Sequence, residues 1–260
     1  MTEISLAGGV DVGSCSTKAV IVDSEPKILA SHVMYSGTDF ELAAENAWQE
    51  ALKQAGLEAD GIERVVSTGY GRKSVPFASR AVTEISCHGR GVLHYFRGPV
   101  TVIDIGGQDN KVIKLDAAGH RVSFKMNRKC AAGTGAFLEE MALRLRLPIE
   151  DLDGLARVAD GEVTLGSYCT VFSATEVLEK IKAGHPVNNI VRGLFSSVVK
   201  RVLEMDVLTD TVVLTGGVIE HNPYLAEVIS RHTTCPVKIP PRAQTIGALG
   251  AALYALDQDA

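Results

Sequence analysis

The chain has 260 residues, 46% of them hydrophobic and 22% charged, a composition typical of a globular protein long enough to form two lobes. Its net charge of −5 excludes the basic footprint of a non-specific nucleic-acid binder, so we expect no nucleic-acid partner. The chain lacks both an apolar run of membrane-helix length and a signal-peptide layout, so we expect no membrane association and a cytoplasmic location. Five irregularly spaced cysteines do not suggest a disulfide framework, which leaves thiol or metal chemistry open.

The first predicted lobe covers residues 1–97. Its predicted elements are, in chain order, strands between residues 4 and 35, a helix over about 39–55, a strand that ends at Ser67-Thr68-Gly69, and a helix over 83–96. Arg97-Gly98-Pro99 then interrupts the pattern, and we place the lobe boundary there.

The second predicted lobe covers residues 98–243. Its predicted elements are two strands up to residue 116, a strand over 120–126, helices near 133–145, 172–183 and 187–205, a strand over 212–214, and a helix over 223–232. The last segment is rich in Ala, Gly and Leu. We predict that it forms a helix within residues 244–260 that crosses back and completes the first lobe.

Eight residues recur along the chain. Residues 11–18 read DVGSCSTK and residues 104–111 read DIGGQDNK, with Asp, Gly and Lys at the same offsets. An apolar run flanks each copy on both sides, which predicts strand, tight turn and strand. Glycine lets the turn approach a ligand, amides and hydroxyls at its tip can donate to phosphate oxygens, and the aspartate can hold hydrated Mg²⁺. One copy alone is typical of an ordinary hairpin turn, but the matched pair favours two loops that clamp one nucleotide.

The paired turns and Thr215-Gly216-Gly217 after a buried strand resemble the actin, Hsp70 and sugar-kinase superfamily. The resemblance implies an α/β fold of two ribonuclease-H-like lobes with an ATP cleft between them, in which Gly216 and Gly217 lie against the adenosine. The nucleotide-binding residues that it implies are Asp11, Gly13, Ser14, Cys15, Ser16, Thr17, Lys18, Gly106, Gly107, Gln108, Gly133, Gly135, Gly216 and Gly217.

Four further motifs carry a more specific resemblance: NRKCAAGTG at 127–135, GSYCTVF at 166–172, SCH at 86–88 and IGGQD at 105–109. Together they are similar to the activator components of 2-hydroxyacyl-CoA dehydratases and the ATPase subunits of benzoyl-CoA reductases. The resemblance implies that Cys130 and Cys169 supply half the ligands of a [4Fe-4S] cluster, which a homodimer completes. We expect both cysteines just before a helix, where backbone amides favour an anion.

Other interpretations of the cysteines remain open. Zinc in a four-cysteine site is an alternative to the iron-sulfur cluster, and two buried small side chains are another. We infer no ligand role for Cys87 and expect Cys235 to be structural.

The same resemblance implies the activity. Asp11 and Asp104 would hold Mg²⁺ through some of the water molecules that the ion keeps, and Gln108 would orient the water that attacks ATP. Hydrolysis would drive one electron at low potential onto an iron-sulfur acyl-CoA dehydratase or reductase. The expected partners are a second copy of the chain, that enzyme, and ferredoxin or flavodoxin as electron donor.

Two other function classes fit the residues. A small-molecule kinase or phosphatase of the same fold would need an acidic base near the second turn, and Asp109 could supply it. A nucleotide-dependent scaffold would need neither cysteine. Residues 173–176 read SATE, where dehydratase activators more often carry an acidic pair, so benzoyl-CoA reductase and double-cubane subtypes also stay open.

Overall fold

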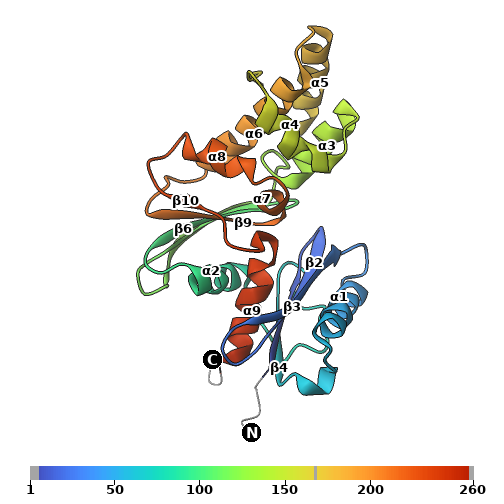
Figure 1. Cartoon of the computed structure of the whole chain (residues 1–260), viewed down its shortest axis with the longest axis vertical. Coiled ribbons are helices and arrows are strands. Elements are labelled where there is room, and N and C mark those ends of the chain that lie inside the picture. The colour runs from blue at the N-terminus through green and yellow to red at the C-terminus, as the bar shows by residue number, and fades with distance from the viewer. Residues whose placement is uncertain (1–5, 167–168, 258–260) are drawn as a thin grey trace. The chain divides into compact units, whose positions relative to one another are not determined.

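The computed structural model describes residues 6–166 and 169–257, and their contacts divide the chain into two units. Unit 1 comprises the described residues of Met1–Gly98, Asp116–Arg121 and Thr245–Ala260, and unit 2 comprises those of Pro99–Leu115 and Val122–Gln244. Each unit contains one five-stranded sheet with helices packed on it (Figure 1).

The elements of unit 1 are β1 (Ala7–Val12), β2 (Ser16–Val22), β3 (Ile28–Tyr35), α1 (Phe40–Ala55), the 3-10 turn η1 (Ala59–Gly61), β4 (Arg64–Thr68), β5 (Arg80–Ala81), α2 (Glu84–Tyr95) and α9 (Ile246–Leu256). The elements of unit 2 are β6 (Val100–Ile105), β7 (Asn110–Leu115), β8 (Arg121–Asn127), α3 (Gly135–Leu145), η2 (Ile149–Asp151), α4 (Leu152–Val158), α5 (Thr170–Lys182), α6 (Val187–Leu203), β9 (Thr211–Thr215), α7 (Gly217–His221), α8 (Tyr224–Ser230) and β10 (Val237–Lys238). A last 3-10 turn, η3 (Ala243–Thr245), precedes α9.

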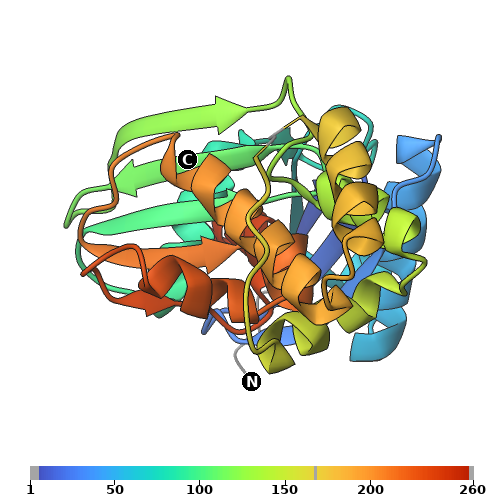
Figure 2. The same ribbon diagram turned by 90° about the horizontal axis from the view of Figure 1, so that it is seen from above.

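The two sheets have the same strand order. Unit 1 has the order β3-β2-β1-β4-β5, and unit 2 has β8-β7-β6-β9-β10. In each sheet the first two strands in sequence pair antiparallel, and the fourth strand pairs parallel with the first. Figure 2 shows β8 as the outermost strand of its sheet. The repeated order confirms the predicted fold class, an α/β fold of two ribonuclease-H-like lobes.

Helices cover both faces of the unit 1 sheet. A Cβ on Gly8 would lie 2.3 Å from the Trp48 ring of α1, whereas a Cβ on Gly9 would lie 2.0 Å from the carbonyl oxygen of Ala248 in α9. Neighbouring strand residues point to opposite faces, so α1 and α9 lie on opposite sides of β1. The chain therefore returns to unit 1 through its last helix, which also packs against α2.

The ends of α1 follow from its flanking residues. Asp39 precedes the helix, and its Oδ1 accepts a hydrogen bond from Leu42 N at 3.0 Å. Gly56 ends the helix with a φ of 66°, a left-handed conformation that glycine adopts without steric cost. These two residues explain why the predicted boundaries of 39–55 agree closely with the observed helix.

The core of unit 2 lies between its sheet and the long helices. Ile103 and Ile105 of β6 and Leu214 of β9 pack in one buried cluster with Phe137 of α3 and Phe195 of α6. The short helices α4 and α7 were absent from the predicted elements, because segments of seven and five residues show too little helical periodicity. Throughout residues 6–166 and 169–257, each helix is too short or too polar to cross a bilayer.

Candidate nucleotide and cluster sites

The first repeated segment forms a closed turn in unit 1. β1 and β2 pair antiparallel with Asp11 opposite Lys18. Gly13 N donates to Ser16 O at 3.0 Å, and a Cβ on Gly13 would lie 2.8 Å from that oxygen. The turn therefore requires glycine at this position, and Ser14 at its tip is exposed.

The second repeated segment forms the same turn in unit 2. Asp104 of β6 lies opposite Lys111 of β7, and Gly106 N donates to Asp109 O at 2.9 Å. Lys111 is only 1% exposed, and its Nζ lies 3.1 Å from Asp104 Oδ2 and 2.8 Å from Asp109 Oδ1. The buried ammonium group therefore holds the base of the turn to its tip, where Gln108 is exposed.

The two buried aspartates differ in their hydrogen bonding. Asp104 Oδ1 accepts from Thr215 Oγ1 at 3.2 Å, while its Oδ2 binds Lys111. Asp11 Oδ2 lies 3.4 Å from Lys18 Nζ, but Asp11 Oδ1 is buried without a hydrogen-bond partner among the described residues. An unpaired buried carboxylate oxygen is unfavourable unless something binds it. Asp11 therefore fits the expected role of holding hydrated Mg²⁺ better than Asp104 does.

The glycine that follows the neighbouring parallel strand packs closely against each aspartate. Gly69 follows β4 with a φ of 90°, and a Cβ on it would lie 2.4 Å from Asp11 Oδ1. Gly216 follows β9 with a φ of 98°, and its Cβ would lie 2.7 Å from Asp104 Oδ1. Reasoning from sequence found Gly216 but missed Gly69. The recurrence of Thr-Gly after a buried strand was the signal that could have revealed it.

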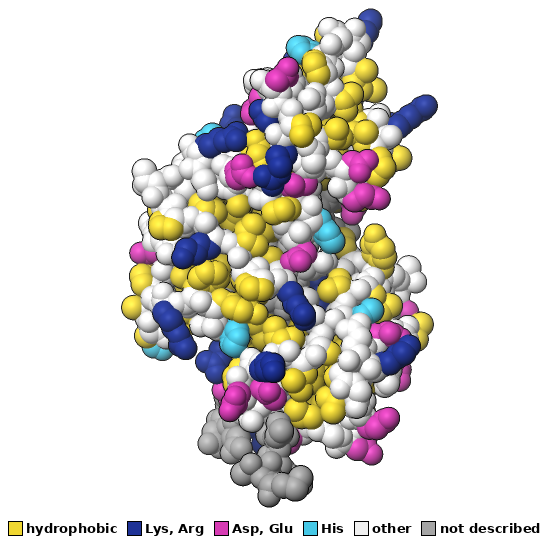
Figure 3. Space-filling view, viewed as in Figure 1, with side chains coloured by type: hydrophobic (Ala, Val, Ile, Leu, Met, Phe, Trp, Pro, Cys, Tyr) yellow, Lys and Arg dark blue, Asp and Glu magenta, His cyan; other side chains and the backbone are white. Residues whose placement is uncertain are grey.

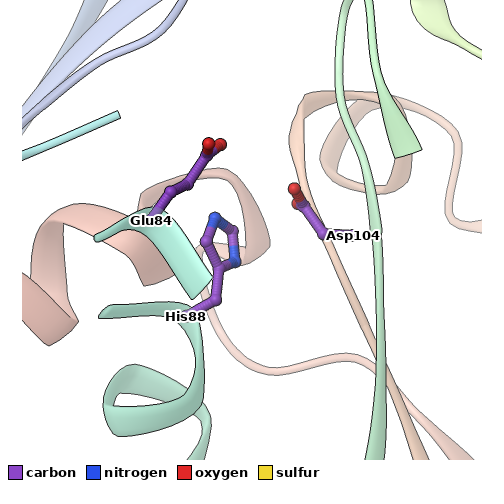
Figure 4. A group of neighbouring side chains, drawn as sticks. All are labelled: Glu84, His88 and Asp104. Carbon is purple, nitrogen blue, oxygen red and sulfur yellow. The ribbon is translucent and has the colours of Figure 1, made fainter. Parts of the chain in front are cut away.

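Two further residues, Glu84 and His88, received no role in the site from the sequence. Glu84 and His88 extend from α2, one turn apart, and Asp104 extends from the end of β6 in unit 2 (Figure 4). His88 is buried, and a Cβ on Gly247 of α9 would lie 3.1 Å from His88 Nε2 and 2.9 Å from Asp11 Oδ2. Glycine at 247 therefore allows the imidazole and the carboxylate to approach this part of α9.

The second turn is hydrogen-bonded to the start of α3. Gly106 O accepts from Gly135 N at 2.9 Å, and Gly107 O accepts from Ala136 N at 2.8 Å. Gly135 must be small, because a Cβ on it would lie 3.1 Å from Gly107 Cα. These contacts place Gly135 against the backbone of the turn itself.

Gly133 lies just before α3 and is also tightly packed against its neighbours. It has a φ of 83°, and a Cβ on it would lie 2.8 Å from Arg201 Cβ of α6. Its carbonyl oxygen accepts a hydrogen bond from Asn110 Nδ2 at 2.8 Å. Asn110 was not among the expected site residues, and it connects β7 to the segment that carries Cys130.

Cys130 and Cys169 are both exposed thiols of unit 2. Cys169 directly precedes α5, and its carbonyl oxygen accepts from Ser173 N at 2.8 Å. Cys130 lies farther from a helix than we expected, because α3 begins at Gly135 after the N-cap Thr134. The positive end of a helix dipole therefore favours an anion at Cys169 but not at Cys130.

The other three cysteines lie in different surroundings. Burial raises the pKa of the Cys87 thiol to about 12, although a hydrogen bond with Thr68 acts in the opposite direction. Cys87 therefore stays protonated near neutral pH, which does not suit a metal ligand. Cys15 Sγ lies 3.8 Å from Ser14 Oγ, and Cys235 Sγ lies 3.6 Å from Leu208 O. Exposed cysteines are thus confined to positions 130 and 169.

Large hydrophobic side chains are exposed on α3 and α5 (Figure 3). Leu143 of α3 is exposed, as are Val171, Phe172 and Leu178 of α5. An open cavity of about 380 Å³ between the two helices is lined by Ala136, Glu140, Arg144, Thr170, Val171 and Ala174. An apolar surface of this kind usually marks an interaction site.

The fold and the paired turns together define a two-unit nucleotide-binding protein of the actin, Hsp70 and sugar-kinase fold. A ROK family glucokinase from Streptomyces griseus shares this fold at 15% identity, with a TM-score of 0.56 over 96% of this chain and 99% of its own. Residues 9–255 match the BadF/BadG/BcrA/BcrD ATPase family, and the chain belongs to that family.

Three relatives match this chain over nearly its full length. The activator of lactoyl-CoA dehydratase from Anaerotignum propionicum is 41% identical over 254 residues, which cover 96% of each chain. The structure of (R)-2-hydroxyglutaryl-CoA dehydratase component A from Acidaminococcus fermentans is 36% identical, with a TM-score of 0.92 over 98% of both chains. The activator of 2-hydroxyisocaproyl-CoA dehydratase from Clostridium difficile, solved with bound ADPNP, is 36% identical, with a TM-score of 0.91 over 97% of this chain and 95% of its own.

Proposed function

We propose that this protein is an ATP-hydrolysing iron-sulfur activator that transfers single electrons at low potential to an acyl-CoA dehydratase. Its relatives that are named as dehydratase activators match it from end to end. One observation carries the proposal furthest: the second turn is hydrogen-bonded through Gly106 O to Gly135 N, five residues after the exposed Cys130. This hydrogen bond supports a direct link, within unit 2, between the proposed phosphate-binding turn and the proposed cluster ligand.

The nucleotide site in this proposal uses both turns. Asp11 and Asp104 would hold Mg²⁺, which neutralises phosphate charge when it is bound. Lys111 is already paired with two carboxylates, so it shapes the turn rather than binding phosphate. Gln108 is exposed at the tip and could orient a water, but an amide is not a base. Positioning and electrostatics would therefore dominate, and we expect slow hydrolysis.

The cluster site in this proposal uses Cys130 and Cys169. A [4Fe-4S] cluster, when bound by four thiolates, accepts and donates single electrons. Two exposed cysteines per chain supply half of those thiolates, so a second copy must supply the rest. The exposed apolar side chains of α3 and α5 support burial of this part of unit 2 against another chain. Ferredoxin or flavodoxin would be the electron donor, and we place the protein in the cytoplasm.

The kinase alternative is disfavoured by the contacts of Asp109. That carboxylate would be the catalytic base, but it lies 2.8 Å from the buried Lys111 Nζ. That oxygen is therefore engaged by the lysine instead of being free to take a proton from a substrate. The scaffold alternative gives no reason for two exposed cysteines in one unit.

Low-temperature EPR of anoxically purified, dithionite-reduced protein tests the proposal. We expect a cluster signal that changes when ADP is replaced by ATP, and loss of that signal in Cys130→Ser and Cys169→Ser. Cys235→Ser is the matched control, because its partly buried thiol contacts Leu208 O and should not bind iron. A signal that is identical with both nucleotides would contradict coupling, and zinc in place of iron would contradict the electron-transfer role.

A further inference from the structure

The same position of the repeated segment makes different contacts in the two turns. Thr17 and Asn110 each directly precede the lysine of the repeat, and both are buried. In unit 1, Thr17 Oγ1 lies 2.9 Å from Ser36 Oγ, and Ser36 Oγ donates to Gly13 O at 2.7 Å. This contact joins the turn to the residue that follows β3.

In unit 2 the longer side chain reaches the cysteine-bearing segment. Asn110 Nδ2 donates to Gly133 O at 2.8 Å, three residues after Cys130. The approach is tight, because a Cβ on Gly133 would lie 3.2 Å from Asn110 Nδ2 and 2.8 Å from Arg201 Cβ. Position 133 therefore has no room for a side chain between Asn110 and α6.

Among the described residues, the Asn110 side-chain amide forms a hydrogen bond through its nitrogen but not through its oxygen. Its Oδ1 is buried and lacks a hydrogen-bond partner among the described residues, although the residue is 1% exposed. Buried side-chain amides generally pair both their oxygen and their nitrogen. The oxygen of this amide therefore retains the capacity to accept a hydrogen bond.

The remaining contacts show what Asn110 adds. Gly106 O and Gly107 O hold the first residues of α3, so they fix the helix start. On the other side, Asn127 Nδ2 donates to Cys130 O at 3.1 Å and ties the segment to β8. Asn110 makes the side-chain contact from the turn to the loop between these two anchors.

We propose that Asn110 is a positioning residue that couples the second turn to residues 130–134. A nucleotide-dependent shift of the turn would move Asn110, and the bond to Gly133 O would pass that shift to the loop that begins at Cys130. The biological use of this coupling rests on the proposed function. The coupling itself requires neither cluster nor partner, so it can be tested separately.

Hydrogen exchange of the full-length, cluster-free protein provides the test. With Mg²⁺ present, we compare backbone exchange in peptides covering residues 128–134 with bound ADP and with bound ADPNP. Asn110→Thr places the unit 1 residue at this position, where it is too short to reach Gly133. We expect the wild type to show a nucleotide-dependent difference, and Asn110→Thr to lose at least about half of it while exchange in the turn still responds.

Asn222→Thr is the matched control. Asn222 is also buried, donates through Nδ2 to a backbone oxygen (Val218 O, 3.0 Å) and leaves Oδ1 unpaired among the described residues. It should retain the wild-type difference at 128–134. If Asn110→Thr does not fold, Asn110→Ser removes the same contact with a smaller side chain.

Two results would overturn the inference: no nucleotide-dependent difference at 128–134 in the wild type, or the full difference in the Asn110 variants. Neither result depends on iron. Failure of the cluster proposal would instead appear as absent iron in anoxically purified protein that still shows the exchange difference, so the two failures are distinguishable.

Discussion

Gly106 O accepts a hydrogen bond from Gly135 N at 2.9 Å, which joins the tip of the second turn to the first residue of α3. The bond uses an amide that the first helical turn leaves without an intrahelical partner. The turn and the helix therefore satisfy each other's hydrogen-bonding groups, so neither can move far without the other. Any ligand that reshapes the turn acts directly on the chain segment after Cys130.

We expect Gly216→Ala to destabilise the protein strongly. Gly216 has a φ of 98°, and a Cβ would lie 2.3 Å from Ile105 O, so the substitution adds a backbone clash to a strained conformation. The cost should exceed about 3 kcal/mol in urea unfolding. Gly98→Ala is the control, because Gly98 has a φ of 88° but its Cβ would meet no described atom within 4 Å. It should cost about 1 kcal/mol, and equal costs at both positions would contradict this account.

We expect Lys111→Met to be more harmful than Lys18→Met. Lys111 is 1% exposed and pairs with two carboxylates, so its removal leaves buried negative charge uncompensated. This should cost about 3–5 kcal/mol. The Lys18 side chain is 12% exposed and lies 3.4 Å from Asp11 Oδ2, so its loss should cost about 1–2 kcal/mol. Chemical unfolding of both variants measures the difference, and the reverse order would show that the two turns are not built as described.

We expect Cys87 to resist alkylation in the folded protein. Its pKa is raised to about 12 by burial, and the thiolate is the reactive form. Iodoacetamide at pH 8 should label Cys130 and Cys169 in cluster-free protein, whereas Cys87 should react after unfolding. Peptide mass spectrometry locates the label. Equal labelling of Cys87 in the native protein would show that its site is open.

The same shift predicts a pH dependence of stability. The unfolded chain releases the Cys87 proton near the ordinary pKa of 9.0, whereas the folded chain retains it to about 12. Rising pH therefore favours the unfolded state across this interval, and the free energy of unfolding should fall. Cys87→Ala should weaken that fall relative to wild type when urea unfolding is followed from pH 8 to 11. An unchanged pH slope would contradict the assignment.

The sequence predicted the features that repeat or that follow local rules. Both turns, the fold class and the long helices were found, because Asp-Val-Gly and Asp-Ile-Gly motifs between apolar runs leave few alternatives. The start of α3 was placed too early, since Gly133 and Thr134 precede the helix instead of beginning it. That shift removed the expected helix dipole from Cys130.

The residues that sequence missed depend on packing between distant segments. His88 and Gly247 are 159 positions apart in numbering, yet a Cβ on Gly247 would lie 3.1 Å from His88 Nε2. Asn110 belongs to the second repeated segment, and nothing in the sequence marks its hydrogen bond to Gly133 O. No periodicity marks such contacts, because they arise only when strands and helices are assembled.

The most direct test of the central claim is native mass spectrometry of the anoxically purified protein. We predict a mass of two chains plus one [4Fe-4S] cluster, reduced to the chains alone in Cys130→Ser and Cys169→Ser. A single chain without iron, or a pair of chains that keeps its iron after either substitution, would contradict the claim that two copies share one cluster through these cysteines.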